Sequence, residues 1–430
     1  MKITKIDVML LEDHPAENPG WTPITCRVFT DEGVYGDGEA GVTFGVGEHA
    51  VFGALQDFAR LIIGMDPLEH EVAWERMYRS SYWAQGGGPY AFAAISALDV
   101  ALWDIKGKCL GLPVWKLLGG KMRDSLRCYA SQLQFGWGER LEPAVTLDDY
   151  ARNARAAVDE GYDAVKVDFL TYDVDGHRFS AEETARALEP RLVELVRDRV
   201  AAVREAVGPH VDILMEAHAV VDAQSAIRLA REVEPFGIAY LEEPCTPDPD
   251  LTRRVSERVA IPIAVGERVY SRWQFAPYLR DGSVALVQPD IGNCGGMTEA
   301  KKICDMACVH DVGVQVHACS SPLLTAASLQ LEAAVPNFAI HEHHVFNLHG
   351  YNRRLCVRDL QPVRGRFAVP DLPGLGNEFS DYLLETSTHV VVEGSSGAGA
   401  AGGGPRRKGQ KGREGAGGEV LIRQCHSCVV

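Results

Sequence analysis

Between residues 124 and 346, short β-rich segments recur at nearly even intervals, and most of them end on an acidic residue or a histidine. The residues that close six consecutive segments are Glu216, Glu242, Glu267, Asp290, His317 and Glu342, separated by 23 to 27 residues. This spacing fits one strand, one helix and their connections, because parallel strands need a long crossover between them. The repeat therefore restricts the region to parallel α/β folds.

Eight strand candidates can be read in this region, and helical patterns lie between them. They are CYASQ, AVKVDF, DILMEAH, IAYLEEP, IPIAVGE, ALVQPD, VGVQVHA and FAIHEHH. This alternation predicts a parallel βα barrel. A doubly wound sheet is the alternative, but no GxGxxG phosphate loop supports it.

The flanking regions have a different character. Residues 1–123 combine strand-like segments with a helix in AFAAISALDVALWDIKGKCLG, which predicts a separate α+β domain. Residues 347–385 are rich in turns, and we expect them to complete that domain. Residues 386–430 include GSSGAGAAGGGPRRKGQKGREGAGG, and this low-complexity composition predicts a disordered tail.

Composition limits the classes of partner. The 430 residues carry a formal net charge of −16, which argues against nucleic acid or an anionic membrane as the main partner. A small anionic substrate remains compatible, because a bound divalent cation can invert the local field. No apolar run is long enough to cross a bilayer, and the eleven cysteines form no disulfide or zinc pattern. We therefore expect a cytoplasmic protein.

Three of the strand-end residues are glutamates on successive strands. The carboxyl ends of barrel strands form one rim, which carries the active site in this architecture. Glu216, Glu242 and Glu267 would repel one another there unless a cation neutralised them. Oxygen ligands favour a hard ion, so the sequence predicts one Mg²⁺ at this rim.

The next two strands end in Asp290 and His317. An imidazole that is paired with a buried carboxylate has a fixed tautomer and raised basicity, so His317 is the predicted general base.

Two further groups share this rim by strand periodicity. His218 follows Glu216 by two residues, so both side chains face the same side of the strand. Lys166 and Asp168 have the same relation on the preceding strand. In HEHH at 341–344, the histidines at 341 and 343 face away from Glu342, and the spacing is not that of a helical zinc site.

Several longer stretches resemble a known family. They are SALDVALWDIKGKCLGLPVWKLLGG, LEEP, IPIAVGERVYSRWQF, VQPDIGNCGGMTEAKKI and the run around PNFAIHEH. Over residues 1–385 the chain resembles the mandelate racemase and muconate lactonizing enzyme branch of the enolase superfamily, and within it the D-galactonate dehydratases. The resemblance implies a (β/α)₇β barrel, residues 124–346, under a cap made from residues 1–123 and 347–385.

The resemblance also implies roles for the site residues. It places one Mg²⁺ on Glu216, Glu242 and Glu267, makes Asp290 and His317 a dyad, and brings Glu342 to the substrate carboxylate. Two departures stand out. Glu216 occupies a metal position where Asp is usual. The second strand reads KVD rather than the KxK of racemases and cycloisomerases, which disfavours a lysine base there.

These inferences predict a sugar acid dehydratase, a hydro-lyase. His317 would remove the C2 proton of the sugar acid, and Mg²⁺ with Glu342 would stabilise the charge that develops. His218 would then protonate the departing 3-hydroxyl, giving a 2-keto-3-deoxy acid, while Lys166 assists the substrate carboxylate.

Substrate-binding residues are expected from several places. They are Lys166, Asp168 and Glu342 on the rim, and Trp21, Tyr82 and Trp83 from the cap, with loops at 13–21 and 43–49 setting specificity. We expect a homo-oligomer. A racemase, epimerase or cycloisomerase of the same fold, and a non-catalytic metal- or ligand-binding relative, remain as alternatives.

Overall fold

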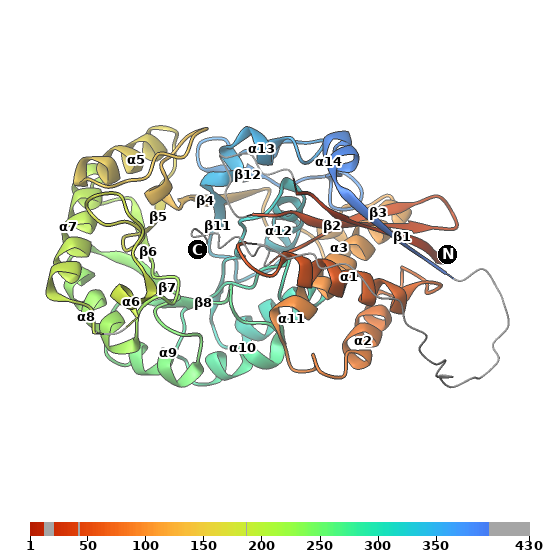
Figure 1. Cartoon of the computed structure of the whole chain (residues 1–430), viewed down its shortest axis with the longest axis horizontal. Helices are drawn as coiled ribbons and strands as arrows, with labels where there is room; N and C mark the ends of the chain where they lie inside the picture. Colours follow the sequence, from red (N-terminus) through yellow and green to blue (C-terminus); the bar gives the residue numbers. More distant parts are fainter. Residues whose placement is uncertain (13–20, 42–43, 186, 395–430) are drawn as a thin grey trace, which may run out of the picture.

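The computed structural model describes residues 1–12, 21–41, 44–185 and 187–394. Figure 1 shows a barrel of strands ringed by helices on one side of the molecule, and the N-terminal elements beside it on the other. Among the described residues, the barrel strands in chain order are β4 (Ser125–Ser131), β5 (Ala164–Asp168), β6 (Asp212–Glu216), β7 (Ile238–Glu242), β8 (Ile263–Val265), β9 (Leu286–Val287), β10 (Gly313–Val314) and β11 (His341–His344).

Neighbouring barrel strands are parallel and follow chain order from β4 to β10, and β11 pairs with β4. The ring closes just before β11, where Val314 forms a parallel bridge with Phe338. One helix of the outer layer follows each strand except the last. These helices are α5 (Leu147–Asp159), α7 (Pro190–Val207), α8 (Ala223–Val233), α9 (Pro249–Ser256), α10 (Ser271–Arg280), α11 (Gly296–Val309) and α12 (Pro322–Ala334). The predicted (β/α)₇β barrel is confirmed.

Local signals in the sequence fix where these helices start. The Thr146 hydroxyl accepts a hydrogen bond from the Asp149 amide, and the Asp149 side chain accepts one from the Thr146 amide, which caps α5. The Asp222 carboxylate caps α8 in a related way, by accepting from the amides of Gln224 and Ser225.

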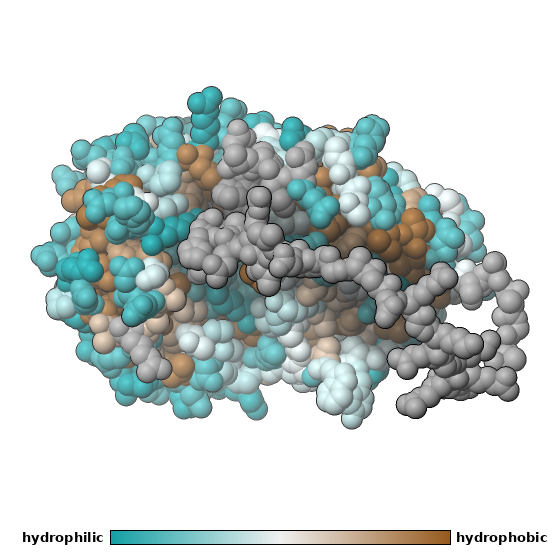
Figure 2. All heavy atoms as spheres, viewed as in Figure 1, coloured by the Kyte–Doolittle hydropathy of each residue, from teal (hydrophilic) through white to brown (hydrophobic). Residues whose placement is uncertain are grey.

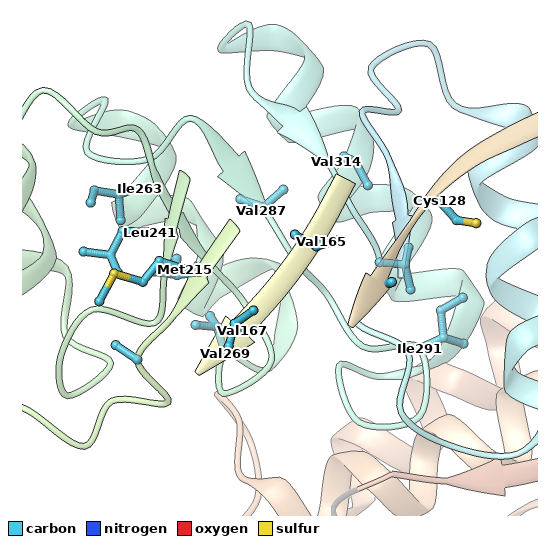
Figure 3. Packing of buried hydrophobic residues seen from close by; sticks show 14 of the residues in the cluster. Cys128, Val165, Val167, Met215, Leu241, Ile263, Val269, Val287, Ile291 and Val314 are labelled. Atoms are coloured by element: carbon cyan, nitrogen blue, oxygen red, sulfur yellow. The ribbon is translucent and has the colours of Figure 1, made fainter. Parts of the chain in front are cut away.

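Strand periodicity separates the barrel into two layers. The residues that point into the barrel form a small cluster of Tyr129, Ala164, Leu214, Tyr240, Ala264 and Ile340. The alternate residues, including Val165, Val167, Met215 and Leu241, belong to the large core under the helices (Figure 3). Lys166 and Asp168 continue the inward series of Ala164, so they lie on the barrel axis above the packed interior.

The cap is an antiparallel sheet covered by helices. Its strands are β1 (Ile3–Leu10), β2 (Ile24–Thr30) and β3 (Tyr35–Ala40), and its helices are α1 (Glu48–Ile62), α2 (His70–Ser80) and α3 (Pro89–Leu110). Helix α3 lies directly on β3, where a Cβ atom on Gly38 would be 1.8 Å from the carbonyl oxygen of Ala97. Glycine at this position is what allows helix and sheet to approach so closely.

The C-terminal segment joins both parts of the molecule. Strand β12 (Arg366–Ala368) pairs with β4 of the barrel, while the amide of Phe379 donates to Asp37 in the cap. Helices α13 (Gly350–Arg353) and α14 (Asp381–Thr386) lie along the same segment, and α4 (Val114–Leu117) links α3 to the barrel.

One prediction about the tail was wrong. Residues from 386 onward were expected to be disordered, but Thr388–Glu393 form strand β13, which pairs with β1 at the edge of the cap sheet. The run of β-branched residues in HVVVE outweighs the Gly-rich composition of the adjoining segment. Residues 395–430 lie outside the described part of the chain.

The surface is mixed. On the face in Figure 2, hydrophilic side chains cover much of the barrel's outer helices, with apolar patches between them. Within the described ranges, no helix is both long and apolar enough to cross a membrane.

Candidate active site

Three glutamates converge at the carboxyl end of the barrel. Glu216 ends β6, Glu242 ends β7, and Glu267 follows β8 across Gly266. One carboxylate oxygen of each lies within 4.8 Å of the corresponding oxygens of the other two. The predicted convergence is therefore present in the structure.

These residues suit a hard divalent cation. Glu242 is fully buried, and its Oε2 atom has no hydrogen-bond partner among the described residues. A buried anionic oxygen without a donor is costly, and an ion bridging the three carboxylates would satisfy it. Asp173, Asp175 and His177 also lie close together, but they occupy a largely exposed loop after β5.

The ammonium group of Lys166 lies among the carboxylates and supplies positive charge to the site. Its Nζ atom lies 2.6 Å from Glu242 Oε1, 3.0 Å from Glu342 Oε1 and 3.2 Å from Glu216 Oε2. Burial lowers the pKa of Lys166, but the carboxylates of Glu242, Glu342 and Glu216 outweigh burial and hold it well above its ordinary value. Lys166 therefore lies in the site as a cation.

The predicted dyad is formed. His317 Nδ1 lies 2.7 Å from Asp290 Oδ2, and the other carboxylate oxygen of Asp290 accepts a hydrogen bond from the Gly292 amide at 2.6 Å. The other ring nitrogen, Nε2, lies 3.2 Å from Glu267 Oε2. Burial lowers the pKa of His317, but Cys319, Asp290 and Glu267 outweigh burial and raise it. A cation on Glu267 would weaken that effect and favour the neutral imidazole that a base requires.

A second pair of the same kind lies at the ends of β5 and β6. His218 Nδ1 is 2.7 Å from Asp168 Oδ2, and the pairing follows from the register, in which Asp168 lies opposite Glu216. Burial lowers the pKa of His218, but Glu216 and Asp168 outweigh it and raise the pKa to about 9. Asp168 was predicted as a substrate-binding residue, and in the structure this side chain contacts His218.

The Glu342 carboxylate lies in the site as an anion, and three hydrogen-bond donors contact it. Oε1 accepts from Ser131 Oγ at 2.6 Å and contacts Lys166, and Oε2 accepts from the Ala318 amide at 3.0 Å. Burial raises the pKa of Glu342, but Lys166 leads the groups that lower it below its ordinary value. Glu342 is thus placed to fix the position of Lys166.

The rest of the HEHH segment behaves as its alternation predicts. His341 Nδ1 lies 2.6 Å from Glu332 Oε2 on α12, and His343 Nδ1 lies 2.6 Å from the Tyr162 hydroxyl. Both partners lie in the outer layer, on the opposite face of β11 from Glu342.

The structure does not bring the three predicted cap residues to the catalytic side chains. Trp21 is 1% exposed and packs against Phe44 and Tyr351 in the core between cap and barrel. Tyr82 and Trp83 are 76% and 93% exposed, on a loop whose Gly86 carbonyl accepts from Gln274 on α10. Residues 13–20 and 43 of the predicted specificity loops lie outside the described residues.

Some side chains at the site were not predicted. Arg268 contacts Glu267 at 2.9 Å, and Ser131 contacts Glu342. Ser131 and Gln132 are the last two residues of the first strand candidate, CYASQ, so applying the strand-end rule to all eight strands would have found them. Gln134 lies two residues later, in the 3₁₀ turn Leu133–Phe135, and carries no comparable signal in the sequence.

Two family models match the chain. The model described as enolase C-terminal domain-like matches residues 149–383. The model for the mandelate racemase / muconate lactonizing enzyme N-terminal domain matches residues 21–119. Together they span most of the cap and the barrel.

Curated relatives and solved structures agree with these models. The D-galactonate dehydratase of Variovorax paradoxus is 34% identical over 393 residues, which are 89% of this chain and 94% of the relative. The enzyme of that name from Pectobacterium atrosepticum is 32% identical over the same shares. The structure of a candidate dehydratase from Zymomonas mobilis ZM4 is 48% identical, with a TM-score of 0.89, and covers 91% of this chain and 100% of its own. An enolase superfamily member from Salmonella Typhimurium is 45% identical with the same coverage and a TM-score of 0.88.

Proposed function

Because the chain belongs to the mandelate racemase and muconate lactonizing enzyme branch of the enolase superfamily, we propose that it is a Mg²⁺-dependent sugar acid dehydratase. The observation that carries the proposal is the placement of a histidine–aspartate pair on each side of the three glutamates. Such a site can remove a proton with one imidazole and deliver a proton with the other.

The substrate class follows from the relatives and from the charges. Curated relatives over most of the chain are D-galactonate dehydratases, so an aldonate is the proposed substrate. The buried Lys166 ammonium would attract a carboxylate to the same rim. Mg²⁺ on Glu216, Glu242 and Glu267 would supply further positive charge beside that carboxylate, which lowers the cost of the charge that develops there.

The residues of the chain divide the reaction between them. His317 Nε2 takes the C2 proton, and the electron pair of the C–H bond moves toward the carboxylate. Asp290 holds the His317 ring and stabilises the imidazolium that forms. His218 then protonates the 3-hydroxyl, so the C3–O bond breaks and water leaves. A proton shift from the 2-hydroxyl oxygen to C3 turns the resulting enol into the 2-keto-3-deoxy acid.

An epimerase is the second candidate, because Asp168 makes His218 as well oriented as His317 and a base on each face could invert a carbon. A library of sugar acids, incubated with the enzyme, Mg²⁺ and D₂O, separates the two activities. Dehydration gives a keto acid that reacts with semicarbazide, whereas epimerisation gives deuterium at C2 and a change of optical rotation. A library without keto acid, under conditions where the protein is folded, would overturn the proposed dehydratase.

A further inference from the structure

The imidazole of His218, which lies in the turn after β6, has neighbours at both ring nitrogens. Its Nδ1 atom contacts Asp168, and its Nε2 atom lies 3.4 Å from the side-chain amide nitrogen of Gln132, a neighbour that packs beside Nε2 but cannot accept its proton. The Gln132 side chain also accepts a hydrogen bond from the Gln134 amide group. Gln134 Oε1 accepts from the backbone amide of Asp168 at 3.1 Å, which closes the loop of contacts. His218, Asp168, Gln132 and Gln134 therefore form one continuous ring, here called the His218 ring.

The backbone under this ring is strained. Gln132 has a φ of 68° and His218 a φ of 44°, both in the left-handed region that residues with a side chain rarely adopt. Strained backbone persists only where the surroundings hold it in place, and such positions gather at functional sites. Here the backbone amide of Gln132 donates to the backbone carbonyl of Lys166, and the backbone amide of His218 donates to Glu216 Oε1 at 2.8 Å. The strained backbone at these two residues therefore helps to fix the direction of the His218 imidazole.

The ring is also buried. Gln132, Gln134 and Asp168 are 4%, 0% and 5% exposed, so their polar groups have little access to water and depend on one another. The pair of Asp168 and His218 has the same 2.7 Å contact between Nδ1 and Oδ2 as the pair of Asp290 and His317. A buried carboxylate that contacts Nδ1 fixes both the tautomer and the rotation of the imidazole.

We propose that Asp168, supported by Gln132 and Gln134, is a positioning residue that aims Nε2 of His218 at the leaving hydroxyl. The inference rests on the proposed dehydration and assigns a role to the acidic residue that ends the KVD strand. In the elimination, the C3–O electron pair leaves on oxygen and takes the proton from His218 Nε2. A His218 imidazole that has rotated away cannot deliver that proton, although His317 can still remove the C2 proton.

The test compares two rates in Asp168→Ala, with the full chain, Mg²⁺ and the sugar acid that yields keto acid. General acid catalysis is worth about 10²- to 10⁴-fold, so keto acid release should fall about 100-fold or more. Exchange of the C2 proton with D₂O should stay within a few-fold of the native rate. A 3-chloro-3-deoxy analogue should restore elimination, because chloride leaves without a proton. Asp212→Asn, at the opposite end of β6, is the matched control and should change neither rate.

A purely structural role gives a different pattern. If exchange and elimination fall together in Asp168→Ala, or if elimination stays at the native rate, the positioning role is overturned. Should the alanine variant fail to fold, Gln132→Met probes the ring from its other end, and the same selective but smaller loss is expected. Parallel loss of both rates in that variant would equally overturn the proposal.

The outcome remains separable from the proposed function. If the native enzyme releases no keto acid from any sugar acid, the proposed dehydratase is refuted. The crystal structure of Asp168→Ala would still test the positioning role, because it shows the orientation of the His218 imidazole and needs no turnover. The structure should show the His218 imidazole rotated away from its native direction. An unmoved imidazole would show that Asp168 does not position it.

Discussion

The Nζ atom of Lys166 lies 2.6 Å from Oε1 of Glu242, while Oε2 of the same carboxylate has no hydrogen-bond partner among the described residues. One oxygen of Glu242 is thus used by the protein, and the other is left for a ligand. This division of the carboxylate has consequences both for metal binding and for the role of the lysine.

Metal removal should abolish activity and lower stability. Mg²⁺ should raise the melting temperature of the native enzyme, because a ligand that binds only the folded state stabilises it by mass action. Glu242→Gln should lose this response and the activity while remaining folded. Scanning calorimetry with and without EDTA measures the melting temperature, and release of keto acid under the same conditions measures the activity. Full activity in excess EDTA would contradict the assignment of the cation.

Removing the lysine should leave carboxylates buried without their counter-ion. Breaking a buried pair costs about 3–5 kcal/mol, so Lys166→Met should be destabilised by that order in EDTA. Mg²⁺ should recover part of the loss, because it neutralises the same carboxylates. Lys301→Met, which removes a surface pair with Asp305, should cost less than about 1 kcal/mol. Equal losses in the two variants, measured by urea denaturation, would argue against a charge network at the site.

The dyad should control the first proton transfer. His317→Asn should stop both keto acid release and exchange of the C2 proton with D₂O, by about 10⁴-fold or more, since the α-proton is weakly acidic. Asp290→Asn should keep the fold but reduce both rates severely, because the imidazole loses its orienting charge. NMR of deuterium incorporation gives the exchange rate. Near-native exchange in His317→Asn would move the base to another residue.

Two buried histidines away from the site should make stability depend on pH. Burial lowers the pKa of His343 to about 3 and that of His70 to about 4. Both are neutral in the folded state, whereas the unfolded chain takes up protons below about pH 6.5. Their stabilising contribution is therefore complete above that pH and is lost as the pH falls toward the folded pKa, by roughly 1.4 kcal/mol per pH unit for each histidine.

Urea denaturation at pH 7, 6 and 5 measures this dependence. His343→Asn should be less stable at pH 7 but should lose stability less steeply on acidification. His310→Asn, at an exposed position, should keep the native slope. An unchanged slope in His343→Asn would show that this histidine is not buried in its neutral form.

Truncation should distinguish strand β13 from the Gly-rich segment after it. A chain that ends at Gly394 should be as stable as the full chain, because the Gly-rich remainder has too few apolar residues to form a core. A chain that ends at Glu385 loses the strand that pairs with β1 and its buried Val392. We expect a loss of about 2 kcal/mol or more and a tendency to aggregate through the exposed edge of β1. Thermal unfolding measures the loss of stability, and light scattering measures the aggregation. Equal stability and equal scattering in the two truncated chains would contradict the role of β13.

The predictions that succeeded rest on periodicity. Glu216, Glu242 and Glu267 could be placed together from sequence because every barrel strand delivers its last residue to the same rim. The neighbouring pair of Asp290 and His317 follows from the same rule. The packing of Trp21 was not accessible in this way, since it depends on how the cap sits against the barrel rather than on any local pattern.

The contact between Asp168 and His218 needed more than periodicity. The two residues are 50 positions apart in sequence, and only the register between β5 and β6 makes them partners. A shift of one residue in that register would turn one of the side chains out of the barrel. Strand β13 was missed for another reason, because averaging its composition with the Gly-rich segment hid six residues of clear strand character.

Strand β11 has an implication for how natural variation in this protein should be interpreted. Glu342 and His344 lie on the catalytic face, whereas His341 contacts Glu332 of α12 and His343 contacts Tyr162, in the loop before β5. In a saturation mutagenesis library, neighbouring codons should therefore give opposite phenotypes. Substitutions at 341 and 343 should reduce the amount of folded protein, whereas Glu342→Gln, which keeps the shape of the side chain, should leave a folded but inactive product. The effect of a variant in this strand should therefore depend on which face of β11 its side chain occupies.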